Sequence, residues 1–260
     1  MAAPSTQELV DYVNLLRGWT RRNLETRYSR SLLRLLWTLL NPIIFVVIYV
    51  VIFGVIFKQT GGSVPYLSYL ISGYIIYRAV QNALNANSCI VDNLDLIEHA
   101  KFSREIIPLS QVTVVAIDLL VTFTAYLLVA GIQGHPPTEK IFAAPLVLLS
   151  TLIFSAAVCI TASVIQVFVR DFQFAANLVG MAMFFTSPVS YLPESLPHWL
   201  NWLNWSNPIS VNISALRALT LQDQWPDWSL FGVHFVITSL ALVLAVWHLH
   251  AVEYRIVDLG

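Results

Sequence analysis

The chain has 260 residues, of which 57% are hydrophobic and only 11% are charged, and its mean hydropathy is +0.69. This composition is too apolar for an ordinary soluble domain and indicates an integral membrane protein. The net charge of -1 argues against nucleic acid as a partner, because a phosphate-binding surface needs an excess of basic residues.

Residues 5–34 are predicted to form an amphipathic helix at the membrane interface. Leu9, Tyr12, Leu16 and Trp19 recur at helical spacing, and charged residues occupy the other side. An apolar side with Trp, next to an Arg cluster, suits an anionic membrane surface, so we expect this side to face lipid. A solvated helix before the first span is the alternative.

The first two membrane spans are expected at 35–57 and 65–86. The first carries no charge and is long enough to cross a hydrocarbon core of ~30 Å at ~1.5 Å per residue. Asn41-Pro42 is expected to bend its start. The second span is rich in Tyr, contains Arg78 and is the least hydrophobic of the spans.

Residues 88–105 form a charged interruption between two apolar segments. On a helical wheel Asp92 and Asp95 fall on one side while Ile90 and Leu94 fall on the other, which predicts a short amphipathic helix. Because an acidic face cannot enter lipid, this face must meet water or a partner protein.

Four further spans are predicted, at 107–132, 141–169, 172–191 and 228–252. The third and fourth of these flank a different kind of segment, residues 192–227, which is rich in Pro and Trp. Its apolar pieces are too short to span, so they are expected to form re-entrant or interfacial helices outside the membrane centre. The resulting fold is all-α and polytopic.

An even number of spans places both termini on one side of the membrane, and the distribution of basic residues selects that side. The side that includes the N-terminus carries Arg17, Arg21, Arg22, Arg27, Arg30, Arg34, Lys101, Arg104, Arg170 and Arg255, and the opposite side carries Lys58, Lys140 and Arg217. The termini and residues 88–105 are therefore predicted to be cytoplasmic, and residues 192–227 external.

The chain lacks the GxxxxGK[ST], GxGxxG and HExxH motifs, so we expect no ATP hydrolysis, no cofactor and no metal site in this chain. Cys89 and Cys159 have no spacing that indicates a metal site or a disulfide. Any energy for work must then come from a separate protein.

Arg78 and Asp118 are the ionisable residues that lie deep in predicted spans, and charge inside a membrane indicates function. Counted from the cytoplasmic ends, their depths differ by roughly 5 Å. We expect the two side chains to approach each other or a water-filled cavity. The alternative is that Arg78 extends to the interface and Asp118 caps a neighbouring helix.

Aromatic residues gather in three of the predicted spans and could line a path for sugar rings, whose apolar faces stack on aromatic ones. Ordinary helix packing is the alternative explanation. The candidates for the path are Trp37, Tyr49, Tyr69, Tyr74, Tyr77, Phe184, Phe185 and Tyr191.

Taken together, several short motifs resemble the membrane permease of type-2 ABC exporters for bacterial polysaccharides such as O-antigen and teichoic acid. The motifs are Leu40-Asn41-Pro42, Pro65-Tyr66, Asn93 to Ser110, Val169-Arg170-Asp171, Ser187 to Tyr191 and Asn207-Pro208. The chain departs from the family pattern at Arg34, His99 and Ser103.

This resemblance implies a homodimeric permease of the bacterial inner membrane that pairs with two copies of a cytoplasmic ATPase, which binds ATP and Mg, and exports a lipid-linked glycan. Residues 88–105 would be the coupling helix, and residues 192–227 an external gate. The implied ATPase-docking residues are Asp92, Asp95, Leu96, Glu98, His99, Lys101, Phe102, Arg104 and Glu105, and the implied gate residues are Trp199, Trp202, Trp205, Asn207 and Pro208.

Two other functions stay open from the sequence. One is a permease of the same type for a drug or a small lipid. The other is a membrane-embedded transferase, which would need paired acidic residues or a His/Asp constellation that the sequence does not show.

Overall fold

A computed structural model describes residues 6–28, 44–58, 61–62, 64–99 and 103–257, and this part of the chain is almost entirely helical. Its longer helices are α1 (Thr6–Tyr28), α3 (Tyr66–Asn85), α5 (Ile106–Ile132), α6 (Ala144–Phe168), α7 (Phe172–Thr186), α9 (Pro208–Thr220) and α10 (Trp228–Val257). The prediction of an all-α fold is confirmed for these ranges, where the only β-type pairing is an isolated bridge between Gly61 and Val64.

Several short helices complete the described chain. A helix over Ile44–Ile56 ends in a π-helical part, η1 (Val50–Ile56). The others are η2 (Asn87–Cys89), η3 (Val91–Asn93), α4 (Leu94–His99), η4 (Glu139–Ala143), η5 (Pro193–Ser195), η6 (His198–Leu200) and α8 (Trp202–Ser206).

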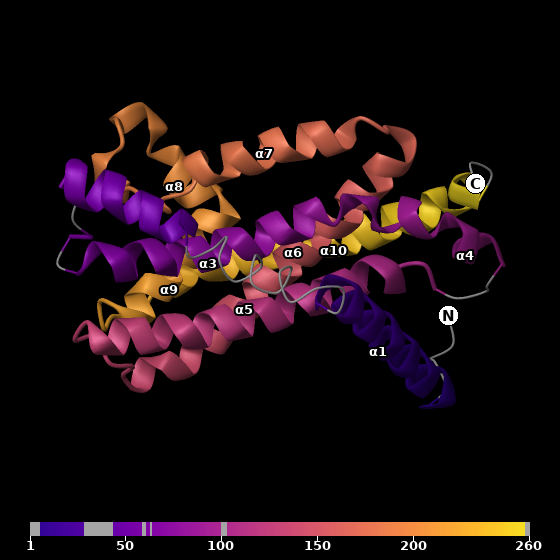
Figure 1. The fold of residues 1–260 in the computed structure, drawn as a ribbon, viewed down its shortest axis with the longest axis horizontal. Coiled ribbons are helices and arrows are strands. Elements are labelled where there is room, and N and C mark those ends of the chain that lie inside the picture. Colours follow the sequence, from indigo (N-terminus) through magenta and orange to yellow (C-terminus); the bar gives the residue numbers. More distant parts are fainter. Residues whose placement is uncertain (1–5, 29–43, 59–60, 63, 100–102, 258–260) are drawn as a thin grey trace.

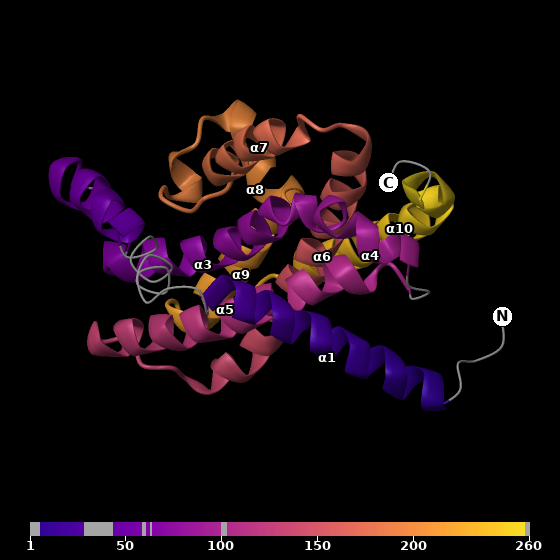
Figure 2. The same ribbon diagram turned by 45° about the vertical axis from the view of Figure 1, so that its right-hand side comes forward.

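The long helices α3, α5, α6 and α10 run alongside one another and form the bundle (Figure 1). Helix α7 lies on one side of α3 and α5 on the other, while α1 leaves the bundle at an angle (Figure 2). One end of the bundle carries η3, α4 and the last turns of α10, and we call it the Asp92 end. The other carries α8, α9 and the turn before α10, and we call it the Asp223 end.

Within the described ranges, three helical stretches are long and apolar enough to cross a membrane. They are Ile106–Ile132, Glu139–Phe168 and Trp228–Tyr254, with mean hydropathies of 2.2, 2.3 and 2.2. Ile44–Ile56 and Phe172–Thr186 are apolar but shorter. Helix α3 is less apolar, and most of its residues are buried by neighbouring helices, so its Ser and Tyr side chains need not meet lipid.

The main hydrophobic core is built around α3. Leu70 and Ile76 of α3 are fully buried and belong to one cluster with Tyr126 of α5 and with Ile213 and Leu216 of α9. Helix α9 is too short to span a membrane, yet nearly all of its residues are buried. Residues 192–227 therefore include a helix that is enclosed by the bundle.

Helix α1 is attached by Trp19, which is only 8% exposed and packs into a second core with Ile90 and Ile106. Tyr12 and Leu16 pack against the same core. The prediction that this side of the helix faces lipid is therefore wrong for Trp19. A helical wheel identifies an apolar side but does not distinguish lipid from a protein core, since both are apolar.

Two predicted boundaries also change. The helix expected over residues 172–191 ends at Thr186, because Ser187 precedes a proline and adopts an extended conformation. The single amphipathic helix expected within residues 88–105 is divided into η2, η3 and α4. Residues 29–34 of the predicted interface helix and residues 35–43 of the first predicted span lie outside the described residues.

The division of the charged stretch has a local cause. Asn87 donates to the Leu84 carbonyl over 2.9 Å, and Asn93 donates to the Cys89 carbonyl over 2.8 Å. Side-chain amides that bond to nearby backbone groups compete with regular helical hydrogen bonding. The chain therefore turns tightly after α3 and becomes α-helical again only at Leu94.

We predict that Trp19→Ala loosens α1 from the bundle. Loss of a buried Trp costs about 3–5 kcal/mol, so the melting temperature of the purified protein should fall and α1 should become sensitive to limited proteolysis. Val13→Ala is the matched control, because Val13 lies on the same helix but is 58% exposed. Equal protease resistance of the Trp19 variant and the control would show that Trp19 does not attach the helix.

Candidate functional site

The outer surface of the Asp92 end is formed by η3 and α4. Asp92 and Asp95 are exposed, and Leu96 is 43% exposed beside them. Asp92 accepts a hydrogen bond from the Ser88 hydroxyl over 2.7 Å. Leu94 instead packs against the second core. Val91 of η3 is also exposed, so the segment presents an acidic surface with two exposed apolar side chains.

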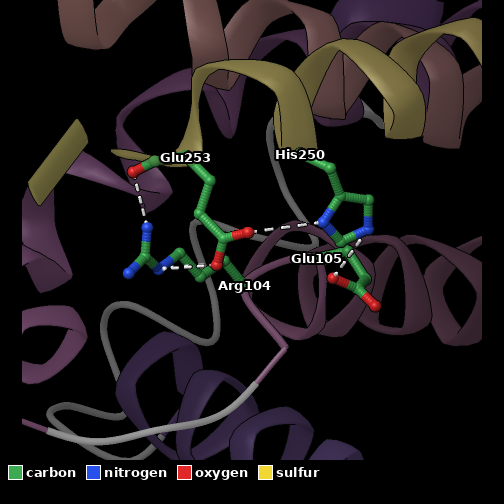
Figure 3. A network of polar contacts seen from close by, with 4 residues as sticks. All are labelled: Arg104, Glu105, His250 and Glu253. Carbon is green, nitrogen blue, oxygen red and sulfur yellow. Dashed lines mark hydrogen bonds and ion pairs between the residues drawn. The ribbon is translucent and has the colours of Figure 1, made fainter. Parts of the chain in front are cut away.

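The last two predicted docking residues face inward. The Arg104 guanidinium lies 3.2 Å from the Glu253 carboxylate and also donates to the Glu253 carbonyl over 2.6 Å (Figure 3). His250 lies between Glu105, at 3.6 Å, and Glu253, at 3.5 Å (Figure 3). The side chains of Arg104 and Glu105 are only 18% and 16% exposed. They connect the start of α5 to the end of α10.

Helix α1 reaches the same network through Tyr12. Burial, and then the nearby Glu105 carboxylate, raise the pKa of the Tyr12 hydroxyl. Three helices, α1, α5 and α10, thus converge directly behind the acidic surface. Lys101 and Phe102 lie outside the described residues, as do the side chains of Glu98 and His99.

Most of the predicted path aromatics form one aromatic cluster between the helix over 44–56, α3 and α7. The Phe45 ring stacks on Tyr49 at 4.4 Å and on Tyr74 at 4.6 Å. Phe184 meets Tyr49 and Tyr77 edge-on, each at 5.1 Å. The cluster consists of Phe45, Tyr49, Phe53, Tyr74, Tyr77, Phe184 and Phe185.

Two members of this cluster, Phe45 and Phe53, were not among the sequence candidates. Together with Tyr49 they repeat every four residues, which is a helical spacing that could have identified them. The predicted path residue Trp37 lies outside the described residues. Tyr69 and Tyr191 belong to a different site, at the Asp223 end.

That site is organised by Arg217 of α9, which is only 3% exposed. Its guanidinium donates to the carbonyls of Tyr69, at 3.0 Å, and Val189, at 3.1 Å, and to the Ser72 hydroxyl at 3.1 Å. The guanidinium carbon also lies 3.5 Å from the centre of the Tyr69 ring. A buried cation is thus balanced by carbonyl oxygens and an aromatic face.

Arg217 is one of three side chains that bind the backbone of the turn after α7. It donates to the Val189 carbonyl, Tyr66 donates to the Ser190 carbonyl over 2.9 Å, and Tyr69 donates to the Tyr191 carbonyl over 2.8 Å. We call these three donors the carbonyl clamp. They fix three consecutive backbone groups and so define where α7 ends.

The clamp requires a glycine at position 73. A Cβ atom there would lie 2.7 Å from an Arg217 nitrogen and 3.0 Å from the Val189 Cα. A side chain would therefore force Arg217 and the turn away from α3.

The sequence counted Arg217 among the basic residues on the side opposite the termini, and it did not predict that the residue is buried. Arg217 lies within a Pro- and Trp-rich segment whose apolar pieces are short. Only the packing of α9 against α3 and α6 encloses it.

Arg78 and Asp118 line the same small hollow between α3 and α5, together with Asn82 and Thr122. Arg78 donates to the Tyr74 hydroxyl over 2.9 Å. The two charged side chains thus line one hollow. The hollow holds about 10 Å³, which is room for one water molecule at most.

The predicted gate residues separate into an exposed and an enclosed group. Trp199, Trp202 and Trp205 are 73%, 51% and 58% exposed. Asn207 caps α9 by accepting from the Ile209 amide over 3.0 Å, and it donates to the Ser187 hydroxyl over 2.9 Å. Pro208 occupies the first turn of α9.

A surface ion pair also lies at the Asp223 end. Lys140 donates to the Asp223 carboxylate over 3.0 Å and Thr138 donates to it over 2.9 Å. These hydrogen bonds, that of Lys140 first, hold the pKa of Asp223 below its usual value. A depressed carboxylate pKa means that the contact is intact at neutral pH and is lost only as the pH falls through that lowered pKa.

No group of three or more His, Cys, Asp or Glu side chains in the described ranges is arranged to hold a metal ion. Cys89 and Cys159 are buried and free. What the geometry offers is an acidic surface at one end, a clamp at the other and aromatic and polar side chains between them.

The profile of the ABC-2 type transporter family matches residues 15–221, which is most of the chain. The chain belongs to the ABC-2 type transporter family. Its match includes α3, α5, α6, α7 and α9, and so covers both the acidic surface and the clamp.

Several curated permeases are similar to this ABC-2 chain. An O-antigen export system permease protein RfbA of Klebsiella pneumoniae is 25% identical over 249 residues, covering 95% of both chains. A second protein of that name from the same species is 24% identical over 251 residues, again with 95% of each chain covered. The RfbA protein of Myxococcus xanthus is 28% identical over 186 residues, covering 71% of each chain.

We predict that Arg217→Met lowers the stability of this permease by about 3 kcal/mol, because three hydrogen bonds of about 1 kcal/mol each are lost. Arg217→Lys should also lower the stability, since an ammonium lacks the planar guanidinium geometry that reaches several acceptors. Thermal unfolding in detergent measures both effects.

Lys140→Met is the matched control, because it removes a half-buried cation at the same end of the bundle whose partner, Asp223, is exposed. It should change the melting temperature little. A stable Arg217→Met variant that melts like the control would contradict the proposed importance of the clamp.

Proposed function

We propose that this ABC-2 permease exports a lipid-linked polysaccharide, O-antigen-like or another cell-envelope glycan, across the inner membrane. The observation that carries the proposal is the similarity to O-antigen export permeases along 95% of both chains. ATP and Mg are bound by a separate ATPase subunit, because the chain has no nucleotide-binding motif of its own.

The proposed topology has six spans, formed by the helix over 44–56 with the residues before it, α3, α5, α6, α7 and α10. Both termini and the Asp92 end are cytoplasmic, following the excess of basic residues on that side. The Asp223 end, with its exposed Trp side chains, is then external and lies at the headgroup level.

The acidic surface at the Asp92 end is proposed as the ATPase-docking site. Asp92, Asp95 and Leu96 are exposed there, whereas Arg104 and Glu105 bind residues of α10. The outer part of the charged stretch thus contacts the partner. When the partner displaces this outer part, the inner part transmits the displacement to α10. Two copies of the ATPase would engage two copies of the permease.

The aromatic cluster is proposed as part of the translocation path. It lies between α3, α7 and the helix over 44–56, and the latter two helices leave apolar side chains such as Val55, Phe174 and Leu178 exposed. In a homodimer these faces would meet a second copy, and the path would run between the copies. Aromatic rings in the path stack on sugar rings without selecting one glycan sequence.

The proposal predicts a specific export defect. Cells depleted of this permease should lose the glycan from their surface and accumulate it, still lipid-linked, on the inner side of the membrane. Replacement of the partner ATPase by an inactive variant is the control and should give the same defect. Normal surface glycan together with increased sensitivity to toxic compounds would overturn the proposal in favour of drug export.

The docking site is tested by charge reversal. The triple variant Asp92→Lys, Asp95→Lys and Glu98→Lys should bind the ATPase roughly tenfold more weakly, because the reversed charges of this segment then oppose the partner. Co-purification with the ATPase from detergent measures this binding. Glu194→Lys, an exposed reversal at the other end, is the control and should bind normally. Unchanged binding by the triple variant would exclude this surface.

A further inference from the structure

A line of polar side chains runs between α3 and α5. Arg78, Asn82 and Asn85 lie on one face of α3, at spacings of four and three residues, and Gln111 and Asp118 lie on one face of α5. These residues line two hollows, and Asn82 borders both of them. The polar face of each helix is therefore turned toward the other helix.

The hollow nearer the Asp92 end is a cleft of about 300 Å³ between α1, α3 and α5, which is large enough for a small ligand. Its polar lining comes from Asn23, Thr26, Asn82, Asn85 and Gln111. We call it the amide cleft. Its remaining described lining residues, Ala86 and Val114, are apolar, so none of the described residues that line it carries a charge.

Much of the hydrogen-bonding capacity of the amide cleft is unused by the residues that the structure describes. Asn23 donates to the Ser110 hydroxyl over 2.8 Å, and Asn85 accepts from Gln81 over 2.9 Å. Asn82, Gln111 and Thr26, however, make no side-chain hydrogen bond to other residues of the described chain. Each amide offers both donors and an acceptor, so a ligand with the same dual character can bind in several ways.

This lining selects among the parts of a lipid-linked glycan. A phosphate prefers Arg, Lys or the N-terminus of a helix, and a lipid chain prefers an apolar wall. A sugar ring carries hydroxyl groups that both donate and accept, and it has apolar patches that Ala86 and Val114 can contact. Neutral amides beside small apolar groups therefore fit a neutral sugar ring best.

The second hollow, beside Arg78 and Asp118, is too small to extend the binding site for a sugar ring. It holds only about 10 Å³ beside Arg78 and Asp118, so a sugar ring does not fit there. A ring in the amide cleft thus remains near the Asp92 end, close to α1. This is the level at which the headgroup of a membrane lipid would enter if that end is cytoplasmic.

We propose that the amide cleft binds a sugar ring of the lipid-linked glycan before transport, with Asn82 and Gln111 as its main hydrogen-bonding residues. The inference rests on the proposed export function and adds the part of the substrate that is recognised and the place where it binds.

The test compares three probes with the full chain in lipid nanodiscs: a polyprenyl-diphosphate-linked disaccharide, the same polyprenyl diphosphate without sugar, and the free disaccharide. Wild-type protein should bind the sugar-bearing lipid more tightly than the sugar-free lipid. The difference isolates the contribution of the sugar. The free disaccharide should compete with the sugar-bearing lipid.

The double variant Asn82→Leu and Gln111→Leu should bind the sugar-bearing lipid about thirtyfold more weakly, as expected when the hydrogen bonds of two neutral side chains are lost. Its affinity for the sugar-free lipid should not change. If this variant does not fold, Asn82→Ala and Gln111→Ala are tested singly, and each should lose about fivefold. Gln173→Leu is the matched control, because it removes an exposed amide from the start of α7.

The outcomes separate this inference from the proposed function. Equal wild-type affinity for the two lipids, or an unchanged sugar contribution in the double variant, would contradict sugar binding in the amide cleft. Neither result would contradict the proposed glycan export. Failure of wild-type protein to bind either lipid would count against the export of a lipid-linked glycan and would remove the inference with it.

Discussion

The buried cation of Arg217 is the constraint on which the Asp223 end depends. A charge removed from water must be compensated by well-placed partners, and here two carbonyls, a hydroxyl and an aromatic ring provide them. Their positions require the turn at Val189 to lie close to Arg217 and a glycine to occupy position 73. Because that turn ends α7, the same contacts determine where Phe184 enters the aromatic cluster.

A second set of charges organises the opposite end in a different way. Arg104, Glu105, His250 and Glu253 connect the beginning of one long helix to the end of another, and they lie directly behind an acidic surface. A partner that displaces this surface would therefore act on α10 through charged contacts as well as through the backbone. Rigid contacts of this kind suit the proposed docking of an ATPase subunit on this surface.

Helix α3 connects the two ends and has a different character on each side. One side carries Tyr74 and Tyr77 toward the aromatic cluster, and another carries Asn82 and Arg78 toward the polar hollows. Neighbouring helices cover it, so it tolerates polar residues that would be unfavourable against lipid. Close approach of α7 is possible because Gly180 faces Gln81, and the Tyr77 hydroxyl donates to the Gly180 carbonyl.

The sequence alone determined the all-α class, the long apolar helices α5, α6 and α10, the exposed acidic segment around Asp92 and the resemblance to polysaccharide permeases. These depend on composition, run length and short motifs, which are local properties. Tertiary structure decided that Trp19 packs against protein and that Arg217 is buried. It also decided that Arg104 and Glu105 point inward and that Tyr69 belongs to the carbonyl clamp and not to the aromatic cluster. Each of these features depends on which helices pack against one another, and this packing is determined by residues that are distant in the chain.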